Sequence, residues 1–137
     1  MALSQQKFRE VVFQLLYSAD YSPVEEELLR FAMSQLEITK KEVCEAMAFK
    51  ERIREQLETI DPLIEEVATE YTLERIPRVE RNILRLSIFE MLHTELPPKV
   101  AISEALRLTR KFASPEGVAF VNAILDKIYN RPHVPQI

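Results

Sequence analysis

The sequence contains a single glycine, Gly117, among 137 residues, and this scarcity is its most informative gap. Sheet proteins use glycine repeatedly in hairpin turns and bulges, so a chain with one glycine and eight prolines is expected to be helical. The phosphate-binding loops G-x-G-x-x-G and G-x-x-x-x-G-K-[ST] each need at least two glycines. Nucleotide binding through either loop is therefore excluded.

Cysteine and histidine are nearly as rare. Cys44 is the only cysteine, which excludes a disulfide within the chain and a cysteine zinc site and favours a cytoplasmic location. Neither His93 nor His133 has an evident nucleophile partner. Glu90 and His93 have the Glu-x-x-His spacing of di-iron bundles, but that site needs a second copy of the motif, which the sequence lacks. We predict no catalytic residue, metal ligand or cofactor, and a role that is not enzymatic.

Long apolar runs are also missing. No segment approaches the roughly 18 consecutive apolar residues that a membrane span needs, so no membrane association is expected. Apolar residues make up 47% of the chain and charged residues 29%, which is the composition of a globular protein. We therefore expect residues 1–137 to form one domain with its own core.

The net charge of −4 is unevenly distributed. Residues 21–74 carry 6 basic and 14 acidic side chains, whereas residues 75–137 carry 10 basic and 6 acidic side chains. Such asymmetry predicts a polyanionic partner for the C-terminal part. Chance, with the charges serving only solubility, is the equally weighted alternative.

Capping residues and apolar periodicity predict about seven helices. The expected starts are Ser4, Ser22 with Pro23 and Glu25, Thr39 with Glu42, Asp61 with Pro62, Pro77, the pair Pro97–Pro98, and Ser114 with Pro115. The third helix is expected to run to about Ile60 and the fourth to Tyr71. The pattern predicts an all-α fold whose two sub-bundles meet near residues 71–77.

The stretch VERNILRLSIFEML, residues 79–92, is apolar on most sides of a helix but contains arginines. Arg78, Arg81 and Arg85 fall within a sector about 60° wide, at about 100° per residue. They either form the basic edge of a binding surface, or pair with the acidic helices and cover the core. Arg85 points deeper and is assigned a structural role.

Four segments of the chain carry a family resemblance. FREVVFQLLY near the N-terminus, then VERNILRLSIFEM, PKVAISEALRLTRKF and FVNAILDKI, resemble the NusB family of bacterial transcription antitermination factors. The likeness covers about 65 of the 137 residues. It implies an all-α fold of about seven helices in two packed helical sub-bundles. It also implies a non-enzymatic protein that binds boxA-type single-stranded RNA together with the ribosomal protein NusE, in the RNA polymerase antitermination complex that supports ribosomal RNA transcription.

The resemblance also implies which residues form the binding surfaces. The RNA-binding residues would be Lys7, Arg9, Arg78, Arg81, Glu116 and Phe120, and the residues facing NusE would be Tyr17 and Glu80. Cationic side chains along phosphates and aromatic faces beneath bases suit single-stranded RNA. Phe120 fits the core of its helix equally well.

One segment departs from the family pattern. Family members have a run of arginines at the start of the first helix, where this chain has Gln5-Gln6-Lys7-Phe8-Arg9. Each missing cation removes a phosphate contact and flattens the salt dependence of binding. We therefore expect weak RNA affinity for the chain alone, with NusE supplying much of the binding energy.

Two alternative functions remain open from the sequence. The chain is either a helical adaptor that contacts proteins only, or a domain related to the RNA-binding module of ribosomal RNA cytosine methyltransferases. A homodimer formed through the first helix or the apolar helix edges is also left open.

Overall fold

The computed structural model describes residues 4–20, 30, 34, 38–69 and 71–131, and the regular structure among them is entirely helical. The chain divides into two compact units, residues 1–55 and 56–137. The expected division near residues 71–77 was wrong, because the short 3-10 helix of that segment packs on the first helix of the second unit. The all-α prediction is confirmed, with six α-helices and one 3-10 helix among the described residues.

The first unit contains helices α1, Gln5–Ala19, and α3, Lys40–Arg54, which pack against each other. The Ser4 hydroxyl oxygen caps α1 by accepting a hydrogen bond from the Lys7 backbone N–H at 3.1 Å. Both expected helix starts are confirmed, that of α3 by a capping box between Thr39 and Glu42. The helix expected from Ser22, Pro23 and Glu25 has its start outside the described residues.

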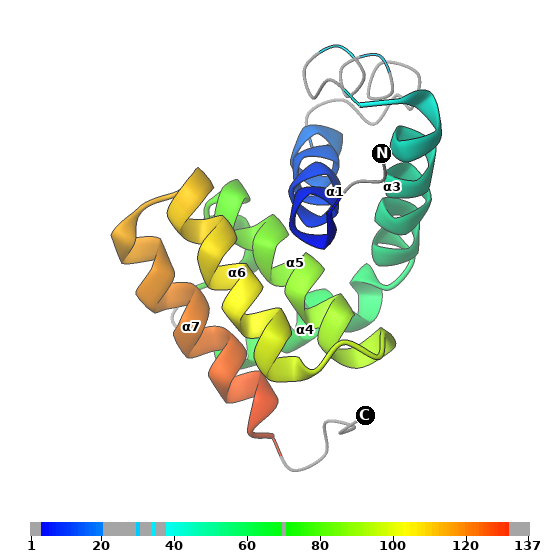
Figure 1. Cartoon of the computed structure of the whole chain (residues 1–137). Helices are drawn as coiled ribbons and strands as arrows, with labels where there is room; N and C mark the ends of the chain where they lie inside the picture. Colours follow the sequence, from blue (N-terminus) through cyan, green and yellow to red (C-terminus); the bar gives the residue numbers. More distant parts are fainter. Residues whose placement is uncertain (1–3, 21–29, 31–33, 35–37, 70, 132–137) are drawn as a thin grey trace. The chain divides into compact units, whose positions relative to one another are not determined.

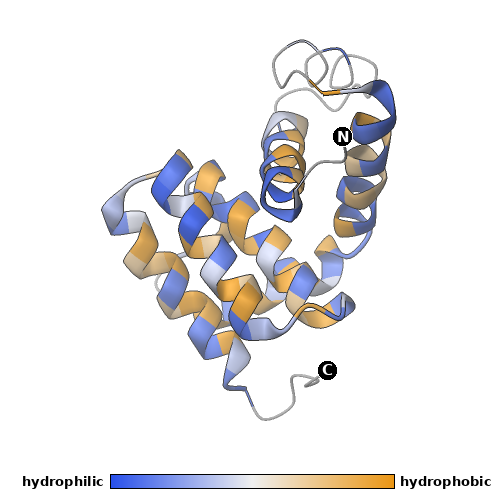
Figure 2. Cartoon of the chain, in the orientation of Figure 1, coloured by the Kyte–Doolittle hydropathy of each residue, from blue (hydrophilic) through white to orange (hydrophobic). Residues whose placement is uncertain are grey.

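The second unit is built around helix α5. Its elements are α4 (Leu57–Val67), the 3-10 helix η1 (Leu73–Arg75), α5 (Arg78–His93), α6 (Pro98–Phe112) and α7 (Pro115–Tyr129). Helix α5 contacts α4, α6 and α7, and α5, α6 and α7 lie side by side (Figure 1). Apolar and polar bands alternate along these helices, as amphipathic packing requires (Figure 2). The ten residues from 82 to 91 are all buried, so α5 is the core helix of this unit.

The proline and serine signals before α5, α6 and α7 are confirmed. Pro77 and Pro97 are the N-cap residues of α5 and α6, and Ser114 caps α7 by accepting a hydrogen bond from the Gly117 N–H at 3.3 Å. Pro115 occupies the first position of α7, where the missing N–H costs no helical hydrogen bond.

The expected start of the fourth helix at Asp61 was wrong. Helix α4 begins at Leu57, and Pro62 lies inside it. The Asp61 carboxylate does not cap a helix, because it is engaged by Arg85 from helix α5, 24 residues further along the chain. A capping signal is local, and here a tertiary ion pair overrides it.

Candidate nucleic-acid interface

Arg81 fixes the turn that leads into α5. The Arg81 guanidinium donates from Nη2 to the carbonyl oxygens of Ile76, at 2.9 Å, and Glu74, at 3.2 Å. Its Nε is buried and has no hydrogen-bond partner in the part of the chain that the structure describes. Arg81 therefore ties η1 to the first turn of α5, and this half-buried guanidinium has a structural role that the sequence did not reveal.

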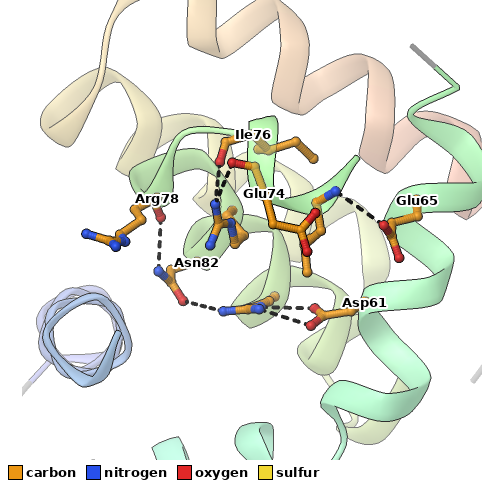
Figure 3. A network of polar contacts seen from close by, with 9 residues as sticks. Asp61, Glu65, Glu74, Ile76, Arg78 and Asn82 are labelled. Carbon is orange, nitrogen blue, oxygen red and sulfur yellow. Dashed lines mark hydrogen bonds and ion pairs between the residues drawn. The ribbon is translucent and has the colours of Figure 1, made fainter. Parts of the chain in front are cut away.

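Arg78, by contrast, is exposed. Its backbone carbonyl accepts a hydrogen bond from the side-chain amide of Asn82 at 3.0 Å. The Arg78 side chain points away from the polar network around Asn82 and Asp61 (Figure 3). Of the arginines on this side of α5, it is the one whose charge solvent or a ligand reaches directly.

Arg85 forms the inner part of the same network. Its Nε and Nη2 donate to the two carboxylate oxygens of Asp61 at 3.0 and 2.9 Å, the paired geometry that suits an arginine and a carboxylate. Its Nη1 donates to the Asn82 side-chain oxygen at 3.3 Å. The Arg85 side chain is only 8% exposed, which confirms its structural assignment.

A pocket of about 340 Å³ lies within the second unit, where η1, the start of α5 and the first turn of α7 meet. The residues that matter for its chemistry are Tyr71, Arg75, Pro77, Glu80, Glu116 and Phe120. The pocket thus brings together three of the residues named from the sequence, Glu80, Glu116 and Phe120. Arg78 and Arg81 are not among its lining residues.

Two aromatic rings stand at one side of this pocket. The centroids of Tyr71 and Phe120 are 5.9 Å apart and their planes are at 90°, an edge-to-face pair. Phe120 is half-buried and Tyr71 is 47% exposed, one of the two large apolar side chains found exposed among the described residues. Phe120 was expected either to lie beneath RNA bases or to belong to the core of its helix. In the structure it packs on Tyr71 and also lines the pocket.

The only glycine of the chain lies at the pocket floor. A Cβ atom at Gly117 would lie 2.9 Å from the Glu80 carboxylate oxygen Oε2 and 3.2 Å from Thr109 Cγ2. The first figure is shorter than ordinary carbon–oxygen contact, so any larger residue would displace the Glu80 carboxylate. Gly117 leaves room for the end of the Glu80 side chain, which reaches it from α5.

Tyr71 and Arg75 were missed by sequence reasoning. Both line the pocket, and both also line a second, adjoining pocket of about 320 Å³. Tyr71 was expected at the end of the fourth helix, but α4 ends at Val67, and Arg75 lies in η1, which is only three residues long. They come close to Phe120 because the chain turns back between α4 and α5. No local sequence pattern predicts this contact.

The remaining sequence-named residues lie on α1, in the first unit. Lys7 is half-buried and its Nζ is 4.0 Å from the Glu10 carboxylate. Arg9 is buried, at 8% exposure, so Lys7 is the more accessible of these two cations. Tyr17 is half-buried, with its ring centroid 6.2 Å from that of Phe13.

No group of three or more histidine, cysteine, aspartate or glutamate side chains among the described residues is arranged to hold a metal ion. None of the described helices is both long and apolar enough to cross a membrane.

The fold and the pocket together define a class of protein. It is a small all-helical protein whose candidate site combines cationic, aromatic and carboxylate side chains, the groups with which proteins contact the phosphates, faces and edges of unpaired nucleotides.

Comparison with known proteins identifies the family within that class. The model of the NusB family matches residues 6–130, and the chain belongs to this family. The transcription antitermination protein NusB of Anaeromyxobacter sp. (strain Fw109-5) is 38% identical over 93% of this chain and 91% of its own length. That of Chlamydia pneumoniae is 36% identical over 91% of this chain and 79% of its own length.

Solved structures agree with this assignment. NusB from T. maritima is similar with a TM-score of 0.81 and 30% identity, covering 98% of this chain and 96% of that one. A NusB chain from a crystal structure of the antitermination factors NusB and NusE in complex with dsRNA is similar with a TM-score of 0.76 and 27% identity, over 91% of this chain and 95% of that one.

Proposed function

We propose that this chain is a transcription antitermination factor that binds boxA-type single-stranded RNA together with NusE, within the RNA polymerase antitermination complex that supports ribosomal RNA transcription. The observation that carries the proposal is the family match over residues 6–130. Relatives named as transcription antitermination proteins match this chain over nearly its whole length. The similar NusB chain crystallised with NusE and dsRNA supports the two partners. The role is one of binding and not of catalysis, and it places the protein in the cytoplasm with the nascent RNA.

Each unit contributes its own set of proposed RNA-binding residues. In the second unit it consists of exposed Arg78, with Arg81 holding the turn beside it, and of Glu116 and Phe120 at the pocket. In the first unit it consists of Lys7 and Arg9. Tyr17 and Glu80 are proposed to face NusE.

The number of accessible cations on this surface is small. Arg81 is occupied by two backbone carbonyls and Arg9 is buried, so Arg78 and Lys7 supply most of the accessible charge. Phosphate contacts dominate the affinity of proteins for nucleic acids. Weak RNA binding by the chain alone, strengthened by NusE, is therefore expected.

The test is a fluorescence-anisotropy titration of a labelled boxA-type RNA, with and without NusE, at about 50 and 200 mM salt. Wild type is compared with Arg78→Ala and with the matched control Lys127→Ala. Lys127 is also exposed but lies near the C-terminal end of α7, whereas the pocket is at its N-terminal end. We expect tight, salt-sensitive binding only with NusE. Arg78→Ala should weaken it and reduce the salt slope by about 0.7, the value for one phosphate of a single strand.

The outcomes separate the candidate functions. If the folded chain binds NusE but no RNA at either salt concentration, the protein is an adaptor for protein contacts and the RNA proposal fails. If RNA binds but Lys127→Ala weakens it as much as Arg78→Ala does, the proposed surface at the start of α5 is wrong.

A further inference from the structure

The pocket between η1, α5 and α7 has the size of a small-ligand site. Its volume of about 340 Å³ lies at the lower end of the range for such sites, roughly 300–1,000 Å³, which suits one nucleotide and not a duplex. All of its lining residues belong to the second unit, so the site does not depend on how the two units are arranged.

The aromatic pair supplies a stacking surface. Tyr71 is 47% exposed and packs edge-to-face with Phe120, so part of the aromatic surface at the pocket is accessible to a base. Stacking of unpaired bases on such faces is a general mode of single-strand recognition and tolerates any base. The rings therefore favour an unpaired nucleotide without choosing which one.

Arg75 supplies the charge for a phosphate. It is exposed, and its guanidinium has no hydrogen bond or ion pair within the part of the chain that the structure describes. It lies at the border of this pocket and the adjoining one, which is where a backbone running from one nucleotide to the next would pass. An arginine with its donors unused suits a phosphate group.

Two carboxylates make the pocket selective. Ionised Glu80 and Glu116 accept hydrogen bonds but donate none, so they repel phosphate and require a ligand with N–H or O–H donors. Among the bases, guanine has two adjacent donors on its Watson–Crick edge, the ring N1–H and the 2-amino group, which pair with both oxygens of one carboxylate. Adenine, cytosine and uracil offer no such adjacent pair.

Glu80 is the better placed of the two acceptors. It is half-buried, and its Oε2 occupies the space that the missing side chain of Gly117 leaves open. Glu116 is exposed at the first turn of α7 and has no such constraint. Because Glu80 is less exposed than Glu116, it loses less side-chain freedom on binding and is the more selective acceptor.

We propose that this pocket binds one unpaired guanine nucleotide of the RNA, with Glu80 on the Watson–Crick edge of the base, the Tyr71–Phe120 pair beneath its face, and Arg75 on its phosphate. This inference rests on the proposed function, since it assigns a base-specific subsite to the same RNA partner. It adds an RNA contact to the NusE-facing role proposed for Glu80, and adds Tyr71 and Arg75 to the RNA-binding residues.

The single glycine provides the assay. In a chain without tag glycines, selective ¹⁵N-glycine labelling gives one amide signal, from Gly117, and Gly117 lines the pocket. This signal is followed while GMP, IMP, AMP, CMP or UMP is added; IMP is guanine's analogue without the 2-amino group. We expect GMP to shift the signal with an affinity at least about 5-fold above that for IMP, the low end for one paired hydrogen-bond contact to a base.

Three variants assign the contacts. Glu80→Gln should remove the preference for GMP over IMP, because an amide offers one acceptor and one donor, whereas the matched control Glu95→Gln, at an exposed carboxylate outside the pocket lining, should keep it. Arg75→Ala should weaken GMP but leave guanosine, which has no phosphate, unchanged. Each variant is first shown to be folded by its helical circular dichroism.

The results separate this inference from the function on which it rests. Equal binding of GMP and IMP, or no shift with GMP at about ten millimolar, would overturn the guanine site; if RNA still binds with NusE in the anisotropy assay, the proposed function stands. Unchanged preference in Glu80→Gln, or equal loss of preference in Glu80→Gln and Glu95→Gln, would overturn the assignment of Glu80. A GMP-specific shift in a protein that binds no RNA would support the pocket and refute the antitermination role.

Discussion

The first and second turns of α5 carry the same kind of side chain on the same side of the helix, and the protein uses them in different ways. Arg78 is exposed, and its side chain points away from the polar network. Arg85, seven residues later, is 8% exposed and held by both oxygens of Asp61. Arg81 lies between these extremes, half-buried and bound to two backbone carbonyls. The difference shows that an arginine of this helix can be enclosed by the fold or exposed to solvent according to its position and not its residue type.

The largest expected effect on stability comes from removing Asp61, the partner of buried Arg85. Asp61→Ala leaves the Arg85 guanidinium buried without its carboxylate, which should lower the free energy of unfolding by about 3 kcal/mol, the lower end for loss of one partner of a buried ion pair. Urea unfolding followed by circular dichroism measures this. The control is the double variant Asp61→Ala/Arg85→Met, which should recover part of the loss because no buried charge remains. A single variant within about 0.5 kcal/mol of wild type, the range of an ordinary surface substitution, would contradict the structural role of Arg85.

A smaller effect on stability is expected from substitutions of Arg81. Arg81→Ala removes two charge-assisted hydrogen bonds to carbonyl oxygens, one of them partly buried, and should cost about 1–2 kcal/mol in the same unfolding experiment. Arg81→Lys keeps the charge but loses the planar fork that reaches both carbonyls. If Arg81 acts mainly through the turn, the lysine variant is destabilised nearly as much as the alanine variant. Full stability with lysine would instead indicate that only its charge matters.

The smallest effect on stability is expected at the glycine that faces the first turn of α5. Gly117→Ala should change the free energy of unfolding by no more than about 1 kcal/mol, because the gain in helix propensity is opposed by the tight contact with Thr109. It should nevertheless displace the Glu80 carboxylate and reduce the preference for GMP over IMP, measured by ligand-observed NMR.

The control for this variant is Ala119→Gly, at an exposed position of the same helix. It should cost about 0.5–1 kcal/mol without changing the preference for GMP. If both variants leave the preference intact, Gly117 does not position Glu80.

Most helix starts could be predicted from the sequence. Ser4, Thr39 and Ser114 cap their helices as expected, because a capping hydrogen bond joins residues only three positions apart. The same local rule failed at Asp61, whose carboxylate is taken by a residue 24 positions away. The family resemblance seen in four segments is confirmed by the match over residues 6–130.

The candidate site was only partly predictable. Glu80, Glu116 and Phe120 were named from the resemblance and do line one pocket, whereas Tyr71 and Arg75 were missed. The RNA and NusE roles of all these residues remain predictions. Arg81 was expected to be available to RNA, and the structure shows in addition that it holds a turn.

By itself the sequence determined the fold class and the positions of most helix starts, because scarcity of glycine, apolar periodicity and capping are all effects of residues close together in the chain. Tertiary structure alone decided that Asp61 pairs with Arg85, that Tyr71 contacts Phe120, and that the Glu80 carboxylate lies next to Gly117. Those outcomes depend on distances between residues far apart in sequence, and such distances are fixed only when the helices pack.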